Sequence, residues 1–495
     1  MTEYSYQFLA IVIYMIIMLG IGWYAFRKTS SLTDYMLGGR GLGATVTALS
    51  AGAADMSGWL LMGLPGAIYL SGLVEAWIAI GLTIGAYLNW LLVAPRLRVY
   101  TQVSNNSITI PSYLDNRLRD NTKLLRIASG IIILVFFTFY VSSGMVSGGK
   151  FFESSFGMDY HTGLLFVSAV VVAYTLFGGF LAVSYTDVIQ GLIMVVTLIA
   201  VPVFGIFLTG GFGATLDSIK EVNPDMLNLL PATATAAGII SSVAWGLGYF
   251  GQPHIIVRFM AISSVKEVKS ARRIGIGWMI FSLLGALSTA FVGVAYFQQQ
   301  GIELKDPETV FIVLGQIIFH PFIAGVILAA ILAAVMSTIS SQLIVTSSAL
   351  IEDIYKALFN KSASDKHYVF LGRMAVLFVS VFAAFVAWNP ESTILGLVAF
   401  AWAGFGAAFG PIILLSLFWK KLTNYGALSG MVAGALVAFI WGRTPSLSGM
   451  LYEIVPGFIV CLVIAFIVSL VTYKKNADIE KEFDETQRIL KEERN

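Results

Sequence analysis

The chain has 495 residues, of which 57% are hydrophobic and only 12% are charged. Soluble domains carry about 25% charged residues, so this composition excludes a soluble domain and indicates an all-helical, polytopic membrane protein. The net charge of +2 gives no indication of a charged partner, and the single cysteine, Cys461, excludes an internal disulfide.

A helix needs roughly 20 apolar residues to cross the hydrocarbon core of a bilayer. The apolar runs predict about thirteen transmembrane helices, with approximate limits 6–26, 42–70, 74–95, 125–149, 161–180, 184–210, 234–257, 273–297, 310–349, 369–388, 393–418, 425–442 and 454–472. The run 310–349 is too long for one simple span, so we expect part of it to form an extracellular helix.

The distribution of Lys and Arg provides an independent check, because cytoplasmic loops carry an excess of both. With the N-terminus outside, the predicted inner loops hold most of them: Arg27, Lys28, Arg96, Arg98, Arg117, Arg119, Lys123, Arg258, Lys266, Lys269, Arg272, Arg273, Lys356, Lys361, Lys366, Lys420, Lys421, Lys474 and Lys475. The predicted outer loops hold few: Lys150, Lys220, Lys305 and Arg443. The sequence therefore predicts a multi-pass protein of the cytoplasmic membrane, with its N-terminus outside and its C-terminus inside.

The second predicted span contains the stretch Ala51–Trp59, in which a carboxylate and several small residues interrupt the apolar run. A charged residue near the centre of a bilayer costs at least about 2.5 kcal/mol on insertion scales. Irregular backbone occurs at that depth only where protein or water satisfies its polar groups. We therefore expect a discontinuous helix here. Asp55 belongs to a functional site, or it has a structural role as a member of an ion pair or as a protonated acid buried in the bundle.

The seventh predicted span contains a second interruption, Ala244–Pro253, with three glycines and a proline in ten residues. It follows the first interruption by five spans, so the two helices cross the membrane in opposite directions. That spacing is typical of inverted five-helix repeats. The predicted organisation is a first helix with its inner loop (1–41), two five-helix repeats (42–210 and 211–418), two extra helices (419–473) and a charged cytoplasmic tail (474–495).

Two places supply the oxygen ligands that a hard cation such as sodium prefers, by analogy with calcium and magnesium sites. The first is the unwound region from Ala53 to Ser57. The second is the ninth span, where the carbonyl of Ala334 lies near the hydroxyls of Ser337 and Thr338, three and four residues further along the helix. Hydroxyls in membrane helices also pack or bond back to the preceding turn, so the residues alone leave both interpretations open.

Other polar and aromatic residues are also candidates. Asp187, near the inner end of the sixth span, suits either ion exit or a solvated turn. Arg40 precedes the first interrupted helix and is either a gate or coupling residue or a positive-inside anchor. Tyr140, Trp245 and Tyr249 lie well inside their spans, where aromatic rings either wall a small amphipathic ligand or pack in the core.

Several features point away from catalysis. The sequence contains no serine-hydrolase elbow and no paired catalytic carboxylates, and its histidines lack metal-ligand spacing. We therefore expect neither an enzyme nor an organic cofactor. Gly81 and Gly85 have the spacing of a small-residue packing face. The polar tail from Lys474 to Asn495 is expected to be a short solvated helix.

Five stretches closely resemble the sodium:solute symporter family, and within it the bacterial sodium/proline symporters. These stretches are Asp34–Arg40, Leu49–Gly63, Gly178–Asp187, Trp245–Pro253 and Ile331–Thr338. The resemblance extends over nearly the whole chain. It implies a leucine-transporter-type core of five plus five inverted helices that works by alternating access. One departure is Ala54, where relatives can carry Ser.

The resemblance also implies roles for individual residues. It assigns sodium to the carbonyls of Ala53, Met56 and Ala334 and the hydroxyls of Ser337 and Thr338, with Asp55 essential beside them. It assigns proline to Ser57, Gly58, Tyr140, Trp245, Tyr249 and Pro253. It assigns coupling or ion passage on the inner side to Arg40 and Asp187.

The function implied by the resemblance is sodium-coupled uptake of L-proline across the cytoplasmic membrane. Its partners are proline, co-transported sodium and the lipid bilayer, with no nucleic acid and no obligatory protein partner. Two alternatives remain open at this point. One is a sodium symporter for another small solute, such as a different amino acid or a carboxylate. The other is a transporter-like sensor that binds solute and signals to a separate protein.

Overall fold

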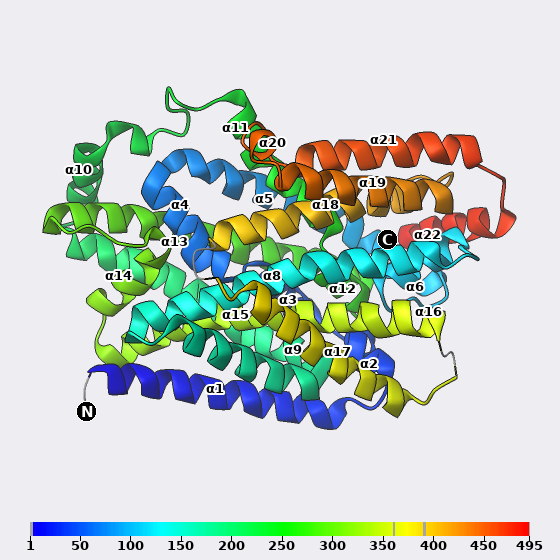
Figure 1. Ribbon diagram of the computed structural model, residues 1–495, viewed down its shortest axis with the longest axis horizontal. Coiled ribbons are helices and arrows are strands. Elements are labelled where there is room, and N and C mark those ends of the chain that lie inside the picture. Colours follow the sequence, from blue (N-terminus) through cyan, green and yellow to red (C-terminus); the bar gives the residue numbers. More distant parts are fainter. Residues whose placement is uncertain (1–2, 360–361, 390–392, 495) are drawn as a thin grey trace.

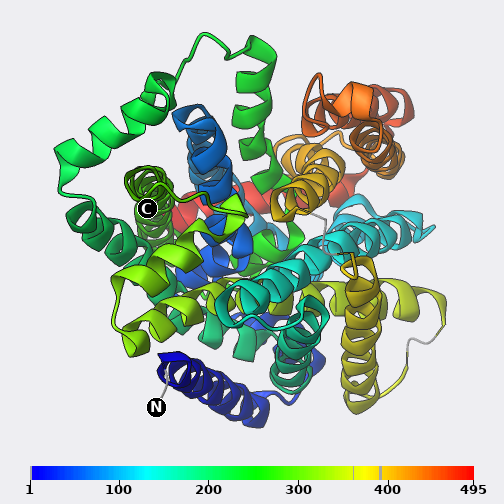
Figure 2. The ribbon, with the colours of Figure 1, turned by 60° about the vertical axis from the view of Figure 1, so that its left-hand side comes forward.

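Figure 1 shows the computed structural model, which describes residues 3–359, 362–389 and 393–494. Most of the long helices run along the long axis of the molecule and form one bundle (Figures 1 and 2). Within the described ranges the regular secondary structure is helical, apart from an isolated bridge between Leu42 and Ile262. Lys361, counted above among the inner-loop residues, lies outside these ranges.

The first half of the chain combines long helices with short 3₁₀ or π turns, which are labelled η. Its elements are α1 (Glu3–Lys28), α2 (Leu32–Leu37), η1 (Gly38–Arg40), α3 (Ala44–Asp55), η2 (Trp59–Gly63), α4 (Leu64–Ser71), η3 (Leu73–Glu75), α5 (Ala76–Leu88), η4 (Asn89–Val93), α6 (Ala94–Val103), α7 (Ile110–Leu118), α8 (Leu124–Phe156), α9 (Tyr160–Leu208), α10 (Phe212–Val222) and η5 (Pro224–Leu227).

The second half likewise combines long helices with short 3₁₀ or π turns. Its elements are α11 (Ala236–Val243), η6 (Ala244–Gly251), α12 (Pro253–Ala261), α13 (Val265–Gln300), η7 (Pro307–Thr309), α14 (Val310–Ile318), α15 (Pro321–Ser348), η8 (Ala349–Tyr355), α16 (Lys356–Leu358), α17 (Asp365–Val386), α18 (Ile394–Phe418), α19 (Asn424–Gly442), α20 (Pro445–Ser448), α21 (Ile454–Thr472) and α22 (Ala477–Arg494).

Ten helical segments among the described residues are long and apolar enough to cross a membrane. Shorter apolar helices add to them, namely Trp59–Ser71, Tyr160–Ala173, Ala236–Gly251 and Pro307–Ile318. The multi-pass, all-helical architecture is therefore confirmed. The number of thirteen crossings stays a prediction.

The first predicted interruption is a break between two helices. α3 ends at Asp55, Met56 has non-helical backbone angles (φ −81°, ψ 62°), and the π turn η2 begins at Trp59. The small residues Ser57 and Gly58 lie between them. The chain then continues into α4, so one span is built from two helical pieces.

The second predicted interruption is longer. α11 ends at Val243, and the chain then forms the eight-residue 3₁₀ segment η6. Gln252 is extended (φ −80°, ψ 105°), and Pro253 begins α12. Proline suits the first turn of a helix, since its missing N–H would be unpaired there in any case.

The glycine pair of α5 allows this second break to lie close to the rest of the bundle. A Cβ atom on Gly81 would lie 2.4 Å from the carbonyl oxygen of Val243, and one on Gly85 would lie 2.2 Å from that of Gly246. Real side chains do not tolerate such distances, so the backbones of α5 and η6 are in direct contact. The predicted packing face is confirmed.

Helix α9 contains the fifth and sixth predicted spans. A straight helix of 49 residues would be about 73 Å long, more than twice the thickness of the hydrocarbon core. Gly179 divides it, with angles (φ 60°, ψ −156°) that are not helical. A Cβ atom there would lie 2.6 Å from the ring of Tyr35, so both the backbone and the space require glycine.

Two segments refine the predicted boundaries. The run 310–349 forms two helices, α14 and α15, separated by Phe319 and His320, which agrees with the expected extra helix. Helix α8 continues to Phe156, so Lys150 lies on a helix rather than in a loop. Its ammonium donates to the carboxylate of Glu308 at 2.8 Å. This ion pair stabilises the charge of Lys150 near the end of a largely apolar helix.

The tail forms the predicted helix, α22, but the helix is not simply solvated. Leu490 is buried and packs with Val99 and Val265, and Arg119 forms an ion pair with Glu482. The tail has an apolar face among its charges, and the bundle covers that face. The expectation of a solvated helix is wrong in this respect.

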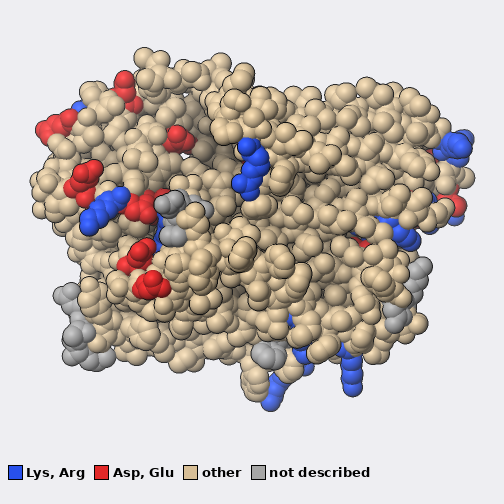
Figure 3. Space-filling view, in the orientation of Figure 1, with Lys and Arg blue, Asp and Glu red and all other residues tan. Residues whose placement is uncertain are grey.

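Charge differs between the two ends of the bundle. Figure 3 shows acidic side chains gathered at the left end of the molecule and many Lys and Arg side chains toward the other end. We call the end with α10, Asp306 and Glu308 the acidic end. We call the end with α6, α16 and α22 the basic end.

Candidate sodium and solute site

The first break lies against α15, and this contact brings four of the predicted sodium ligands together. Ser337 Oγ donates to the carbonyl oxygen of Ala53 at 2.7 Å and lies 3.1 Å from that of Ala334. Thr338 Oγ1 lies 3.4 Å from the Ala53 oxygen. All four residues are buried. The cluster of two carbonyls and two hydroxyls is suited to a hard cation, because each oxygen has a lone pair to offer.

Met56 is the fifth predicted ligand. It directly follows α3, and its non-helical backbone takes its carbonyl out of the hydrogen-bond ladder of that helix. A free carbonyl at this depth is what a ligand requires. Its participation in the oxygen cluster stays a prediction.

Asp55 lies at the end of α3 and contacts the second break rather than the oxygen cluster. Its Oδ2 accepts a hydrogen bond from the Tyr249 hydroxyl of η6. Both residues line a small cavity together with Asn89, whose amide group donates to the Tyr249 carbonyl at 3.0 Å. Asp55 therefore links the predicted sodium residues to the predicted proline residues.

Aromatic rings surround the second break. Trp245 lies nearly parallel to Trp59, with ring centroids 5.9 Å apart, and to Trp402 at 6.4 Å. Trp402 Nε1 donates to the Trp245 carbonyl at 2.7 Å, and its ring meets the edge of Tyr249 at 5.1 Å. Trp245 and Tyr249, predicted as ligand-wall residues, thus belong to one aromatic cluster.

The other predicted proline residues are distributed around the two breaks. Ser57 Oγ accepts from the backbone N–H of Trp59 at 3.1 Å. Gly58 faces α8, where a Cβ atom would lie 2.6 Å from Ser147 Oγ. Tyr140, also on α8, is buried, and its ring lies 5.5 Å from that of His254. These contacts bring α8 to the first break and to the start of α12.

Pro253 differs from the rest of the predicted proline set. It begins α12 and lines a separate small cavity with Asp353, whose lining does not include Asp55 or Tyr249. Its role in this structure is therefore structural, since it begins α12. A role in binding proline stays a prediction.

Asp187 lies in a buried polar network, not in a solvated turn. Ser50 Oγ donates to its Oδ2 at 2.6 Å, and Arg258 Nη2 lies 3.4 Å from the same oxygen. Arg258 also donates to Ser341 Oγ at 2.7 Å. Asp187 and Arg258 are fully buried. Ser50 and Ser341 lie about one helical turn beyond Ala53 and Ser337, so the network adjoins the oxygen cluster.

Arg40 has a more specific position than a membrane anchor requires. Its guanidinium donates to the carbonyl oxygens of Met260 at 2.8 Å and Ser107 at 2.6 Å, and to the side chains of Thr101 and Asn106. The residue therefore joins the segment before α3 to the end of α12 and to the segment after α6. Such a position suits a coupling residue.

Sequence reasoning missed several residues of this region. Arg258 was assigned to an inner loop, whereas the structure buries it completely. Its isolated position in the apolar run Pro253–Ala261 is the signal that identifies it as buried. Asn89 is a similar lone polar residue in an apolar run. For Trp59 and Trp402 the sequence offers no signal, because aromatic residues are common in such spans.

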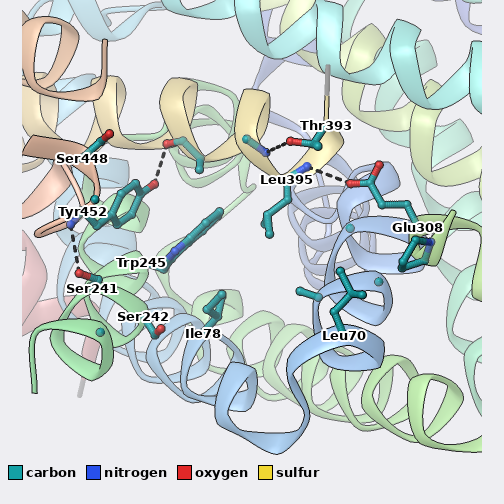
Figure 4. A pocket seen from close by; sticks show the side chains of 18 of the residues that line it. Leu70, Ile78, Ser241, Ser242, Trp245, Glu308, Thr393, Leu395, Ser448 and Tyr452 are labelled. Atoms are coloured by element: carbon teal, nitrogen blue, oxygen red, sulfur yellow. Dashed lines mark hydrogen bonds between the residues drawn. The ribbon is translucent and has the colours of Figure 1, made fainter. Parts of the chain in front are cut away.

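A larger cavity, of about 680 Å³, lies toward the acidic end (Figure 4). Its wall includes Lys150, Asp306 and Glu308, and Trp245 belongs both to this wall and to the aromatic cluster. Asp55 and Tyr249 do not line it. The cavity thus meets the predicted site at Trp245, whereas Asp55 and Tyr249 lie outside its lining.

The model of the sodium:solute symporter family matches residues 35–434. The high-affinity proline transporter PutP of Bacillus subtilis (strain 168) is 63% identical over 470 residues, covering 95% of this chain and 99% of that protein. The osmoregulated proline transporter OpuE of the same organism is 55% identical over 480 residues, covering 97% of each chain. A sodium/proline symporter of Staphylococcus aureus (strain NCTC 8325 / PS 47) is 50% identical over 496 residues, covering 98% of this chain and 96% of that one.

Solved structures share the fold at low sequence identity. The substrate-bound, outward-open state of a sodium-coupled sialic acid symporter has a TM-score of 0.81 at 19% identity, covering 95% of this chain and 99% of that one. Mhp1, a nucleobase–cation symporter, has a TM-score of 0.55 at 14% identity, covering 91% and 98%. These likenesses confirm the predicted leucine-transporter-type fold.

The family model covers well over half of the chain, and the relatives match it almost from end to end. Transport rather than catalysis, as predicted, is the activity of this family. The chain belongs to the sodium:solute symporter family.

Proposed function

We propose that this protein is a secondary transporter that couples the entry of sodium to the uptake of L-proline. Relatives at 63% to 50% identity over nearly the whole chain carry the names of proline transporters or sodium/proline symporters. The observation that carries the proposal is the hydrogen bond from Ser337 on α15 to the carbonyl of Ala53. It joins the first break to a hydroxyl-bearing helix at a point suited to sodium.

The site residues have the following roles in this proposal. Sodium binds the carbonyls of Ala53, Met56 and Ala334 and the hydroxyls of Ser337 and Thr338. Proline binds near the two breaks, where Ser57, Gly58, Tyr140, Trp245, Tyr249 and Pro253 contribute. Sodium holds the first break in one conformation, and the Asp55–Tyr249 hydrogen bond transmits that order to the second break.

The topology completes the proposal. The basic end of the bundle faces the cytoplasm, since cytoplasmic loops are enriched in Lys and Arg. The acidic end then faces outward, with the N-terminus outside and the C-terminus inside. Residues 42–210 and 211–418 form the two inverted repeats, and the helices in 1–41 and 419–473 flank them. Arg40 and the Asp187–Arg258 network lie on the inner route of the ion.

Uptake of labelled L-proline into proteoliposomes tests the proposal, with and without an inward sodium gradient. We expect uphill accumulation that requires sodium and is lost in Asp55→Asn. Asp159→Asn is the matched control, because Asp159 is an exposed helix cap and asparagine caps equally well. Folded protein that fails to accumulate proline, while accumulating another small solute, would overturn the substrate assignment.

A further inference from the structure

The cavity at the acidic end has an aromatic floor. Trp245 and Tyr452 both line it, and Figure 4 shows their rings side by side. The ring centroids are 5.3 Å apart and the planes differ by 27°. Offset stacking at this distance is favourable beyond the apolar area that it buries. Only 6% of Trp245 and 8% of Tyr452 is exposed, so the pair forms a buried part of the cavity wall.

Tyr452 is held by hydrogen bonds to two other helices, α11 and α18. Its hydroxyl donates to the carbonyl of Ala399 on α18 at 2.6 Å, and its backbone N–H donates to Ser241 Oγ on α11 at 3.0 Å. It lies just before α21, in the connection between the last two membrane-length helices, α19 and α21. Those helices lie outside the ten spans assigned to the two repeats. A residue from outside the repeats thus packs against the second break.

A continuous series of contacts leads from Tyr452 to Asp55. Tyr452 stacks on Trp245, and Trp402 binds the Trp245 carbonyl through its indole N–H. The Trp402 ring meets the edge of Tyr249, and the Tyr249 hydroxyl donates to Asp55. Every member of the series is buried. The Tyr452 ring is therefore the first member on the cavity side of a packed path to the predicted site.

We propose that Tyr452 is a gate residue, which holds Trp245 across the path between the acidic-end cavity and the solute site. The inference rests on the proposed function for the identity of the solute, but not for the gating itself. When the Tyr452 ring is present, Trp245 has aromatic neighbours toward both the cavity and the site. Without it, Trp245 gains rotational freedom on the cavity side, and water and solute pass it more often.

The reporter for this gate is a cysteine at Ser57, a residue of the first break that is 2% exposed and does not line the cavity. The only natural cysteine, Cys461, is fully buried, so the parent chain supplies the labelling background. A charged, membrane-impermeant thiol reagent is added to either face of sealed vesicles in sodium without proline. The measured quantity is the labelling rate of Ser57→Cys.

Tyr452→Ala in the Ser57→Cys background should raise labelling from the face of the acidic end by about fivefold, the effect of losing one aromatic pair. Labelling from the other face should not change. Tyr452→Phe keeps the ring and should stay within about twofold of the parent. Tyr425→Ala removes an exposed tyrosine of α19 and is the matched control.

Three outcomes would overturn the gate. They are an unchanged rate in Tyr452→Ala, an equal rise in Tyr452→Phe, and an equal rise from both faces, which signals general loosening. Each variant is first checked for monodisperse elution. If Tyr452→Ala does not fold, Tyr452→Leu carries the same test, because it keeps apolar volume and loses the flat ring.

The labelling test remains separate from the proposed function. It uses neither proline nor transport, so a chain that carries another solute gives the same labelling pattern. Conversely, sodium-dependent proline uptake by the parent together with unchanged labelling in Tyr452→Ala would leave the function standing and remove the gate. A gate also predicts that Tyr452→Ala lets sodium leak without proline, which a merely structural tyrosine does not.

Discussion

The two helix breaks differ in length and in the chemistry of the residues around them. The first is short and surrounded by small residues, and its carbonyls lie against the hydroxyls of α15. The second is an eight-residue 3₁₀ segment, and its neighbours are Trp59, Trp402 and Tyr452. In the proposed function, the first break offers oxygen atoms to a cation, whereas the second offers aromatic surface to an organic solute.

The two breaks are nevertheless connected at two levels. Tyr249 of the second break donates to Asp55 of the first. Nine residues after Tyr249, on α12, Arg258 donates to Ser50 of α3 at 3.1 Å. An ion that orders the first break therefore also restricts the second. We propose this connection as the physical basis for coupling, and substitutions that separate the breaks should test it.

The largest effect is expected from Arg258→Gln. It leaves the fully buried Asp187 without its cationic partner, which destabilises a folded protein by about 3–5 kcal/mol. Thermal unfolding in detergent should show a clear drop in melting temperature. The double variant Arg258→Gln/Asp187→Asn removes both charges and should recover most of the loss. A double variant as unstable as the single one would show that the pair does not act through its charges.

Thr338→Ala should raise the sodium concentration for half-maximal uptake by about thirtyfold, because one oxygen ligand to a charged group is worth about 2 kcal/mol. Maximal proline transport at saturating sodium should change little. Thr346→Ala is the control, since Thr346 lies on the same helix and its hydroxyl only bonds back to Gln342. Equal effects in both variants would place the ion elsewhere.

Tyr249→Phe removes the hydroxyl that donates to Asp55 and keeps the ring. We expect the apparent affinities for sodium and for proline to fall together, each by roughly fivefold, since the lost bond to a carboxylate connects the two breaks. Tyr249→Ala also removes aromatic surface and should weaken proline binding further than sodium binding. Uptake measured over a range of sodium and proline concentrations separates the two apparent affinities. A change in proline affinity alone would mean that the hydroxyl carries no coupling.

The smallest effect concerns the tail. Arg119→Gln removes the ion pair to Glu482, whose partners are 43% and 19% exposed, so the free energy of unfolding should fall by less than about 1 kcal/mol. Leu490→Asp should be more disruptive, because Leu490 is buried against Val99 and Val265. Protease cleavage near residue 476 measures whether α22 is released. Equal cleavage in Leu490→Asp and the parent would contradict docking.

Much of this arrangement could be predicted from the sequence. Both breaks follow from Gly, Ser and Pro in apolar runs, and the packing of α5 follows from Gly81 and Gly85. The oxygen-rich patch on α15 follows from the spacing of Ser337 and Thr338, three and four residues after the Ala334 carbonyl, whereas its assignment to sodium came from the family resemblance. These features have local causes, namely backbone propensity and helical spacing, so the residues carry the signal.

The unpredicted features depend on contacts between distant segments. The pairing of Arg258 with Asp187 joins residues that are 71 positions apart, and the contact of Tyr249 with Asp55 joins residues 194 apart. No periodicity encodes either contact. The docking of α22 depends on a complementary groove beside α6, which cannot be recognised before the helices are assembled. The packing of Tyr452 against Trp245 could not be predicted, because the residues around Tyr452 in the sequence resemble an ordinary loop.

The most direct test of the account is sodium binding to the purified protein, titrated with and without saturating L-proline. Binding of the two ligands at linked breaks requires reciprocal coupling, so proline should tighten sodium binding by about tenfold. Tyr249→Phe should reduce this factor toward one. Equal sodium affinity in the presence and absence of proline, in protein shown to bind both, would contradict the coupling of the two breaks.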